Sequence, residues 1–313
     1  MYSFKGISPK NLVNSLALNP LRVGVLAMKV SAVCQTKRLL LLSMVMGGVM
    51  ASQAAMAAAD PDVSRERGSA RSSMTAMGFD SSGTCFATFS GGTGADAISA
   101  CVTQDGNIMS FLTNGIEHIN VDSFAFEGYA VCTGEGASYY DNAPAGEFGW
   151  NDPVIVQPNG PNKLPLTITR TTSDGAFSLV QKYAFAAATK SITVTMVLKN
   201  ISGATIPDVS LARMVDANID NASGSDVMSN SRAGVVALSD PLGNGLLSLT
   251  ANTLKYARAT STGNFTGFPK TDCSPASNTT EPFSGDVAGK VTYAFGSLAK
   301  NVSKTVGFVY RGH

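Results

Sequence analysis

The sequence predicts an all-β protein, an antiparallel β-sandwich that begins near residue 79. Short runs of apolar and β-branched residues follow one another to the C-terminus, and Gly, Asn, Asp, Ser and Pro separate these runs. No segment has a convincing helical period. No repeat of fixed length is visible either, which disfavours a solenoid or a propeller.

The expected strands are short and evenly distributed, as in sandwiches and barrels. The clearest pair is 177–185 with 192–198, joined by a connection of hairpin length. In the second strand of this pair the even positions from Ile192 to Leu198 are all apolar, so one face is suited to a core. The last two strands are expected to form a second hairpin. The expected strands are 84–90, 98–103, 107–112, 129–133, 153–157, 166–171, 176–185, 191–199, 208–215, 234–239, 246–250, 290–295 and 304–310.

The N-terminal region has the three parts of a secretory signal. Lys29, Lys37 and Arg38 precede an apolar run at 39–50, and small residues follow, with cleavage expected after Ala57 or Ala59. The apolar run is too short for a membrane span, which needs about 20 residues. We therefore expect a secreted or periplasmic protein with no membrane span in the mature chain. The expected parts are an extended N-terminus and cleaved signal peptide at 1–59, a flexible lead-in at 60–78 and the β-sandwich domain at 79–313.

The charge is unevenly distributed along the chain. Between Arg71 and Lys163 there are ten acidic residues and no basic one, whereas 163–313 holds 14 bases and nine acids. The two halves should therefore attract each other, as parts of one sandwich. Residues 60–313 carry a net charge of −5, and such a chain lacks the clustered bases that nucleic acid or anionic lipid requires.

Four cysteines follow the signal segment, an even number that predicts two disulfides in an exported protein. Three connectivities are possible. We favour Cys85 with Cys101, which closes a short Gly-rich loop, and Cys132 with Cys273, which ties the two halves. No pair has C-x-x-C spacing and only two histidines occur in the whole chain, so a zinc site is disfavoured.

The densest polar and aromatic stretch is 117–152, which contains the only tryptophan. Sugar sites combine aromatic faces for the C–H surface of a ring with carboxylates or amides for its hydroxyls. This composition predicts a carbohydrate site. The competing interpretation is that the aromatic residues fill the core edge beneath a long loop and the acids are solvated. The expected ligand-binding residues are Tyr129, Tyr139, Tyr140, Asp141 and Trp150.

An enzyme acting on glycans is the main alternative to a binding protein. Hydrolysis of a glycoside needs two carboxylates, and a histidine with an acid can also move protons on a sugar ring. The catalytic residues would then be His118, Glu117 and Glu127. No G-x-S-x-G elbow is present, so a serine hydrolase is disfavoured.

A calcium site is a further hypothesis, and no other cofactor is indicated. Asp216, Asn218 and Asp220 place oxygen ligands at alternate positions of one loop. The loop lacks the glycine and the final glutamate of an EF-hand, having Asn221 and Val227 there. The alternative is an Asx-rich turn in which Arg213 pairs with Asp216 or Asp220.

The run from Ile192 to Asp220 resembles a pattern in uncharacterised secreted bacterial β-sandwich proteins. It consists of a strand ending in Lys199-Asn200, a Ser-Gly turn, another strand and the sequence Arg-Met-Val-Asp at 213–216. The resemblance implies a fold and no reaction. It is also compatible with a large mutarotase-like sandwich, whose catalytic pair cannot be mapped here because His118 has no second histidine to accompany it. The leading hypothesis is an exported non-catalytic binding protein for carbohydrate, and the third alternative is a structural or surface-assembly component.

Overall fold

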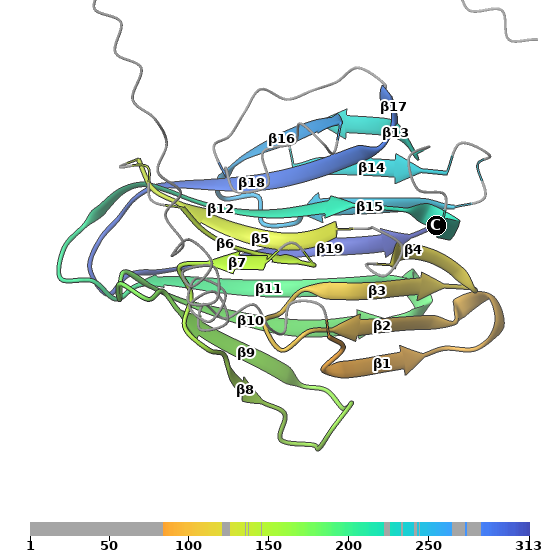
Figure 1. The fold of residues 1–313 in the computed structure, drawn as a ribbon, viewed down its shortest axis with the longest axis horizontal. Coiled ribbons are helices and arrows are strands. Elements are labelled where there is room, and N and C mark those ends of the chain that lie inside the picture. Colours follow the sequence, from red (N-terminus) through yellow and green to blue (C-terminus); the bar gives the residue numbers. More distant parts are fainter. Residues whose placement is uncertain are drawn as a thin grey trace, which may run out of the picture. The chain divides into compact units, whose positions relative to one another are not determined.

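A computed structural model of the protein describes the chain from residue 84 onward, with gaps. The predicted signal segment and lead-in, 1–78, lie outside the described residues. In the described part every strand pairing is antiparallel and the helical structure is limited to short 3-10 turns, which confirms the predicted fold class (Figure 1). None of these turns is long or apolar enough to cross a membrane. The described residues are 84–120, 126–134, 136, 138–144, 146–221, 226–232, 234–240, 243, 245–264, 273 and 283–313.

The largest sheet has nine strands and contains the C-terminal strand near its centre. The predicted hairpin between β10 and β11 is present, with Leu179 opposite Leu198. The even positions of β11 from Ile192 to Leu198 are fully buried, as the alternation predicts. In order across the sheet, the strands are β17 (Phe283–Gly285), β13 (Asp226–Arg232), β14 (Val235–Ser239), β15 (Leu246–Ala251), β19 (Ser303–Gly312), β11 (Ser191–Asn200), β10 (Phe177–Ala186), β9 (Leu166–Thr171) and β8 (Val154–Val156).

A second sheet of six strands is stacked on the first (Figure 1). Its central strand β12 is buried on both faces, with Leu211 and Val215 in the main core and Ala212 and Met214 in a smaller cluster on the opposite face. Because of this two-sided burial, small or apolar side chains alternate with few polar ones on both faces from Val209 to Val215. In order, the strands are β16 (Ala257–Asn264), β18 (Val287–Leu298), β12 (Ile206–Asp216), β5 (Phe126–Cys132), β6 (Ser138–Ala143) and β7 (Gly146–Phe148).

A third sheet is a four-stranded antiparallel meander near the start of the described chain. Its residues Phe89 and Phe111 belong to the same apolar core as Leu211 and Phe308 of the two larger sheets. The three sheets therefore share one main core. The strands of the meander are β1 (Ala87–Gly91), β2 (Ile98–Val102), β3 (Ile108–Thr113) and β4 (Ile116–Asn120), and the 3-10 turns within the described residues are η1 (Gly94–Asp96), η3 (Ala187–Thr189) and η4 (Ile219–Asn221).

Two sequence expectations about the strands were wrong. The last two strands do not form a hairpin, because β18 belongs to the six-stranded sheet and β19 to the nine-stranded sheet. Their connection, 299–302, crosses from one layer to the other. The stretch 117–152, in which only 129–133 was expected to be a strand, contains most of β4 and all of β5, β6 and β7.

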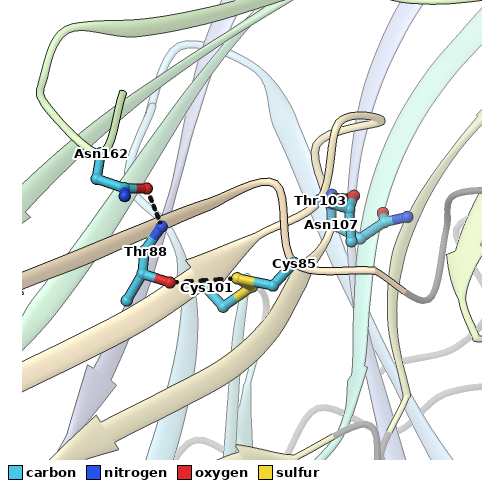
Figure 2. Close-up of a disulfide and its surroundings, with 6 residues drawn as sticks. All are labelled: Cys85, Thr88, Cys101, Thr103, Asn107 and Asn162. Atoms are coloured by element: carbon cyan, nitrogen blue, oxygen red, sulfur yellow. Dashed lines mark hydrogen bonds between the residues drawn. A yellow bond between two sulfur atoms is a disulfide. The ribbon is translucent and has the colours of Figure 1, made fainter. Parts of the chain in front are cut away.

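Both disulfides have the favoured connectivity. Cys85–Cys101 links the segment before β1 to β2, and Cys132–Cys273 links the end of β5 to a residue between β16 and β17 in the sequence. Figure 2 shows the first disulfide beside Thr88, whose backbone N–H donates to Asn162 Oδ1 at 2.9 Å. This contact comes from the loop between β8 and β9, so it ties the edge of the meander to the nine-stranded sheet.

The two disulfides should contribute unequally to stability, because the stabilisation grows with the length of the closed loop. The separations are 16 residues for Cys85–Cys101 and 141 for Cys132–Cys273. Replacing both cysteines by alanine is expected to lower the unfolding free energy by about 3 kcal/mol for the first pair and about 5 kcal/mol for the second. Guanidinium denaturation without reductant measures both values. A larger loss for the shorter loop would contradict the prediction.

Candidate ligand-binding site and the polar interior

The turn between β2 and β3, residues 103–107, is buried between the sheets. Tyr129 Oη and Gln181 Nε2 donate to the carbonyl of Asp105 at 2.9 and 3.0 Å. Tyr183 Oη donates to the carbonyl of Gly106 at 2.6 Å. Gly106 has φ of +95°, and a Cβ there would lie 2.2 Å from Gln181 Nε2. Only glycine therefore fits this position of the turn.

Arg213 on β12 is fully buried and bound on all sides. Its Nη2 and Nε lie 2.6 and 2.9 Å from Glu127 Oε1, and Nε also donates to Tyr310 Oη at 2.9 Å. Nη1 donates to Gln181 Oε1 at 3.1 Å, and Nη2 donates to the Gly106 carbonyl at 3.1 Å. Burial alone would lower the pKa of Arg213, but Glu127 holds it well above its ordinary value. This guanidinium thus joins all three sheets.

Glu127, an expected catalytic acid, is the partner of this arginine. It is fully buried. Its Oε2 accepts a hydrogen bond from the backbone N–H of Ile108 at 2.6 Å, and its Oε1 is shared by Arg213 and Tyr310. These contacts indicate a structural role. The arginine expected to pair with Asp216 or Asp220 is instead bound to this glutamate.

Arg170 on β9 forms a second buried ionic cluster. Its Nη1 pairs with Asp141 and, at 3.2 Å, with Asp105, while Nη2 pairs with Glu147. Asn107 Nδ2 donates to the other oxygen of Asp141. Burial raises the pKa of Asp141, and the Arg170 guanidinium opposes that shift. Asp141, an expected ligand-binding residue, is thus engaged inside the protein.

The three acids around Arg170 are also the described residues that come closest to a metal-binding arrangement, since one oxygen from each lies within 4.8 Å of the others. The Arg170 guanidinium already provides the positive charge that these three carboxylates face. The expected calcium ligands Asp216 and Asn218 are buried, whereas Asp220 is exposed at η4. The calcium hypothesis for that loop stays a prediction.

His118, the other expected catalytic residue, is buried in β4. One ring nitrogen, Nε2, shares a hydrogen bond of 2.7 Å with Thr113 Oγ1. Burial, with smaller contributions from His313 and Lys190, lowers its pKa from 6.5 to about 4. Glu117, on the neighbouring position of the strand, is half-buried and accepts a hydrogen bond from Asn120 at 2.9 Å. Each side chain therefore has its own partner, Thr113 for His118 and Asn120 for Glu117.

An open pocket of about 650 Å³ lies where β6 and β7 meet the turn between β9 and β10. Two rings form its aromatic surface: Tyr140 and Phe148 are stacked with centroids 5.9 Å apart and planes at 22°. Phe148 is 61 % exposed. The lining residues are Gly136, Ser138, Tyr139, Tyr140, Phe148, Gly149, Ser173 and Asp174.

Asp174 supplies a carboxylate to this pocket. Tyr139 Oη donates to its Oδ2 at 2.6 Å, and the backbone N–H of Ala176 donates to its Oδ1 at 3.0 Å. Burial would raise the pKa of Asp174, but these hydrogen bonds and one from Thr172 keep it below its ordinary value. The carboxylate is therefore charged at neutral pH and able to accept further hydrogen bonds.

Backbone contacts hold the two parts of the pocket together. Trp150 forms a β-bridge with Thr172, and the backbone N–H of Ser173 donates to the Gly149 carbonyl at 2.9 Å. Gly149 has φ of +80°, and a Cβ there would lie 2.7 Å from the Tyr139 ring. The glycine lets the chain pass close to this ring, so the acid-bearing turn and the aromatic strands lie side by side.

The structure brings two of the five expected ligand-binding residues into the pocket, Tyr139 and Tyr140. Tyr129 and Trp150 are buried behind it, with Trp150 edge-on to both Tyr129 and Tyr139. The sequence reasoning missed Phe148 and Asp174. The first lies within the aromatic stretch and was detectable there, whereas the second belongs to a distant turn with no distinguishing pattern.

The Arg213 pair should be needed for folding. Arg213→Met leaves Glu127 buried without its cation, and breaking a buried ion pair in this way costs about 3–5 kcal/mol. Guanidinium denaturation at pH 7 measures the loss. The double variant Arg213→Met with Glu127→Gln should lose less than the sum of the two single variants, because no buried charge is left uncompensated. Additive losses would show that the two residues do not interact.

His118 should make the protein less stable in mild acid. Its pKa is about 4 in the folded protein against 6.5 in the unfolded chain, so its stabilising contribution is complete above pH 6.5 and is lost as the pH falls toward 4. Between pH 7.5 and 4.5 this amounts to about 2.5 kcal/mol. His118→Gln keeps an amide for Thr113 and should remove that part of the pH dependence. If the unfolding free energy of the variant depends on pH as that of the unmodified protein does, His118 is not the cause of the acid sensitivity.

Known proteins resemble this chain in fold. No protein-family model and no curated protein matches its sequence. Among solved structures, a bacterial glucoamylase complexed with acarbose has a TM-score of 0.51 at 10% identity, covering 74% of this chain and 32% of its own. A putative aldose 1-epimerase from Escherichia coli K12 has a TM-score of 0.44 at 10% identity, covering 72% of this chain and 98% of its own. A putative kojibiose phosphorylase from the human microbiome has a TM-score of 0.34 at 11% identity, covering 70% of this chain and 29% of its own. The chain thus spans about a third of the glucoamylase, and at this identity the likeness shows the fold alone.

Proposed function

We propose that this is an exported, non-catalytic protein that binds carbohydrate in the pocket formed by β6, β7 and the β9–β10 turn. The observation that carries the proposal is the stacked pair of Tyr140 and Phe148 beside the charged Asp174. A sugar presents apolar C–H faces and hydroxyl groups on the same ring. The two aromatic rings suit the first, and the carboxylate suits the second.

The dimensions of the pocket support this ligand class. Its volume of about 650 Å³ lies within the range typical of small-molecule sites, roughly 300–1,000 Å³. Ser138 and Ser173 add hydroxyl groups that can both donate and accept hydrogen bonds. The fold shared with a glucoamylase solved with acarbose is in keeping with a carbohydrate ligand.

Binding is favoured over catalysis by the carboxylates at the pocket. Asp174 is the single acid among the described lining residues, whereas hydrolysis of a glycoside uses a pair. Two of the three expected catalytic residues, His118 and Glu127, are buried elsewhere. A glycan-acting enzyme remains the alternative, which the experiment below separates from a binding protein.

Export is supported by the signal-like segment before residue 59 and by the disulfides. Two disulfides in one domain are typical of proteins that fold in an oxidising compartment such as the periplasm or the cell exterior.

The aromatic surface should determine affinity for the glycan. A glycan array probed with the purified protein identifies a ligand, and calorimetry then compares variants. Phe148→Ala is expected to weaken binding 10- to 100-fold, because a buried aromatic contact contributes about 1.5–3 kcal/mol. Phe86→Ala is the matched control, since Phe86 is also exposed, at 44 %, but does not line the pocket. Equal affinities for the two variants would exclude this pocket.

The same glycans separate the alternatives. Release of reducing sugar that disappears in Asp174→Asn would make the protein an enzyme. Absence of both binding and turnover, together with self-association in sedimentation, would favour a surface-assembly component. The edge strand β8, with Val154 and Val156 exposed, is the part of the nine-stranded sheet at which strands of two copies would pair.

A further inference from the structure

Outside the pocket, the ammonium groups of two lysines contact the ring of one tyrosine. Tyr256 lies in the turn between β15 and β16, and the Nζ atom of the adjacent Lys255 is 4.8 Å from the centre of its ring. Lys304, from the start of β19, places its Nζ atom 5.4 Å from the same centre. Both distances are within the range of cation–π contacts, about 6 Å. The two ammonium groups, from residues far apart in the sequence, therefore lie at most about 10 Å apart, the sum of 4.8 and 5.4 Å.

The ring that holds the lysines is fixed by its neighbours. Tyr256 is half-buried and packs edge-on against Phe295, with centroids 5.0 Å apart, and against Tyr293 at 6.4 Å. Tyr293 is fully buried, and its hydroxyl donates to the Gly307 carbonyl at 2.8 Å. The position of the ring is thus determined by the core, and the lysines gather on a rigid support.

The positive charge of this cluster is not neutralised by the described part of the protein. Neither Lys255 nor Lys304 forms an ion pair or a side-chain hydrogen bond with a described residue. A ring quadrupole attracts a cation but does not cancel its charge, and two like charges near each other repel. An anionic polymer that reaches both ammonium groups would supply the missing negative charge.

We propose that the Lys255–Tyr256–Lys304 cluster binds the carboxylate or sulfate groups of an acidic extracellular polysaccharide. Each lysine can contact one charged unit of the polymer, because the two Nζ atoms lie close to a common ring. Residues 60–313 carry a net charge of −5, so attraction of a polyanion has to be local to such a cluster. The disulfides favour a polysaccharide over a nucleic acid, because they are typical of proteins outside the cytoplasm.

This site differs from the proposed pocket in residues and in chemistry. The pocket offers aromatic faces and a carboxylate to a ligand, whereas the cluster offers two cations. The two sites can therefore be tested separately.

Native electrophoresis in gels containing polygalacturonate tests the proposal, with uncharged dextran as the neutral reference. The protein should be retarded by polygalacturonate and not by dextran, and the retardation should decrease as salt is added. Lys255→Gln with Lys304→Gln should raise the dissociation constant at least fivefold. Lys163→Gln with Lys300→Gln is the matched control, because it removes the same charge from two exposed lysines elsewhere, and it should be retarded like the unmodified protein.

Gels with dextran sulfate distinguish sulfate from carboxylate as the preferred group, and gels with single-stranded DNA test the competing ligand class. Equal losses in the two double variants would show a general charge effect and overturn the proposal. Retardation by DNA alone, or by none of the polyanions, would also overturn it. Phe148→Ala should be retarded normally, so a failure of the pocket proposal leaves this result unaffected.

Discussion

The arrangement of the sheets depends on two buried guanidinium groups. The ion pairs of Arg170 and Arg213, from the second half of the chain, are made with acids of the stretch that has no basic residue. A buried charge is costly to remove from water unless its hydrogen bonds are replaced. The hydrogen-bond partners of Arg213 come together only when β5, β10, β19 and the β2–β3 turn converge. The need to satisfy this buried guanidinium therefore fixes how the three sheets meet.

The β2–β3 turn is the element on which both clusters converge. The carbonyl of Gly106 accepts from Arg213, while the side chain of Asp105 pairs with Arg170. The turn therefore serves as the backbone link between two ionic groups that share no salt bridge with each other among the described residues. Because a side chain at position 106 would collide with Gln181, the network also explains why a glycine is required at this buried turn.

The sequence was sufficient for the fold class and for strands whose pattern reflects burial on one face, such as β11. It was insufficient where residues distant in the sequence determine whether a polar side chain is buried. In β6, Asp141 is buried because Arg170 binds its carboxylate, and Asn142 beside it is buried as well. The apolar alternation that marks a strand is therefore absent. The connection after β18 has hairpin length, but length does not distinguish a hairpin from a crossing between layers. Tyr139 and Tyr140 were expected at the pocket on composition, whereas Asp174 is brought there only by the fold.

The uneven charge pattern of the chain is explained by ion pairs that hold the fold together. Its acids Asp105, Glu127 and Asp141 are buried against arginines, and Glu147 is bound to one of them. They are therefore engaged in folding and do not form the surface of a ligand site. The pocket at β6 and β7 derives its charge from Asp174 in the other half of the chain. A single carboxylate beside two stacked rings suits a ligand rich in hydroxyl groups better than a cation, whose recognition would call for several converging oxygens. The four acids bound to arginines thus build the frame, and Tyr140 and Phe148 at its edge form the surface proposed for the ligand.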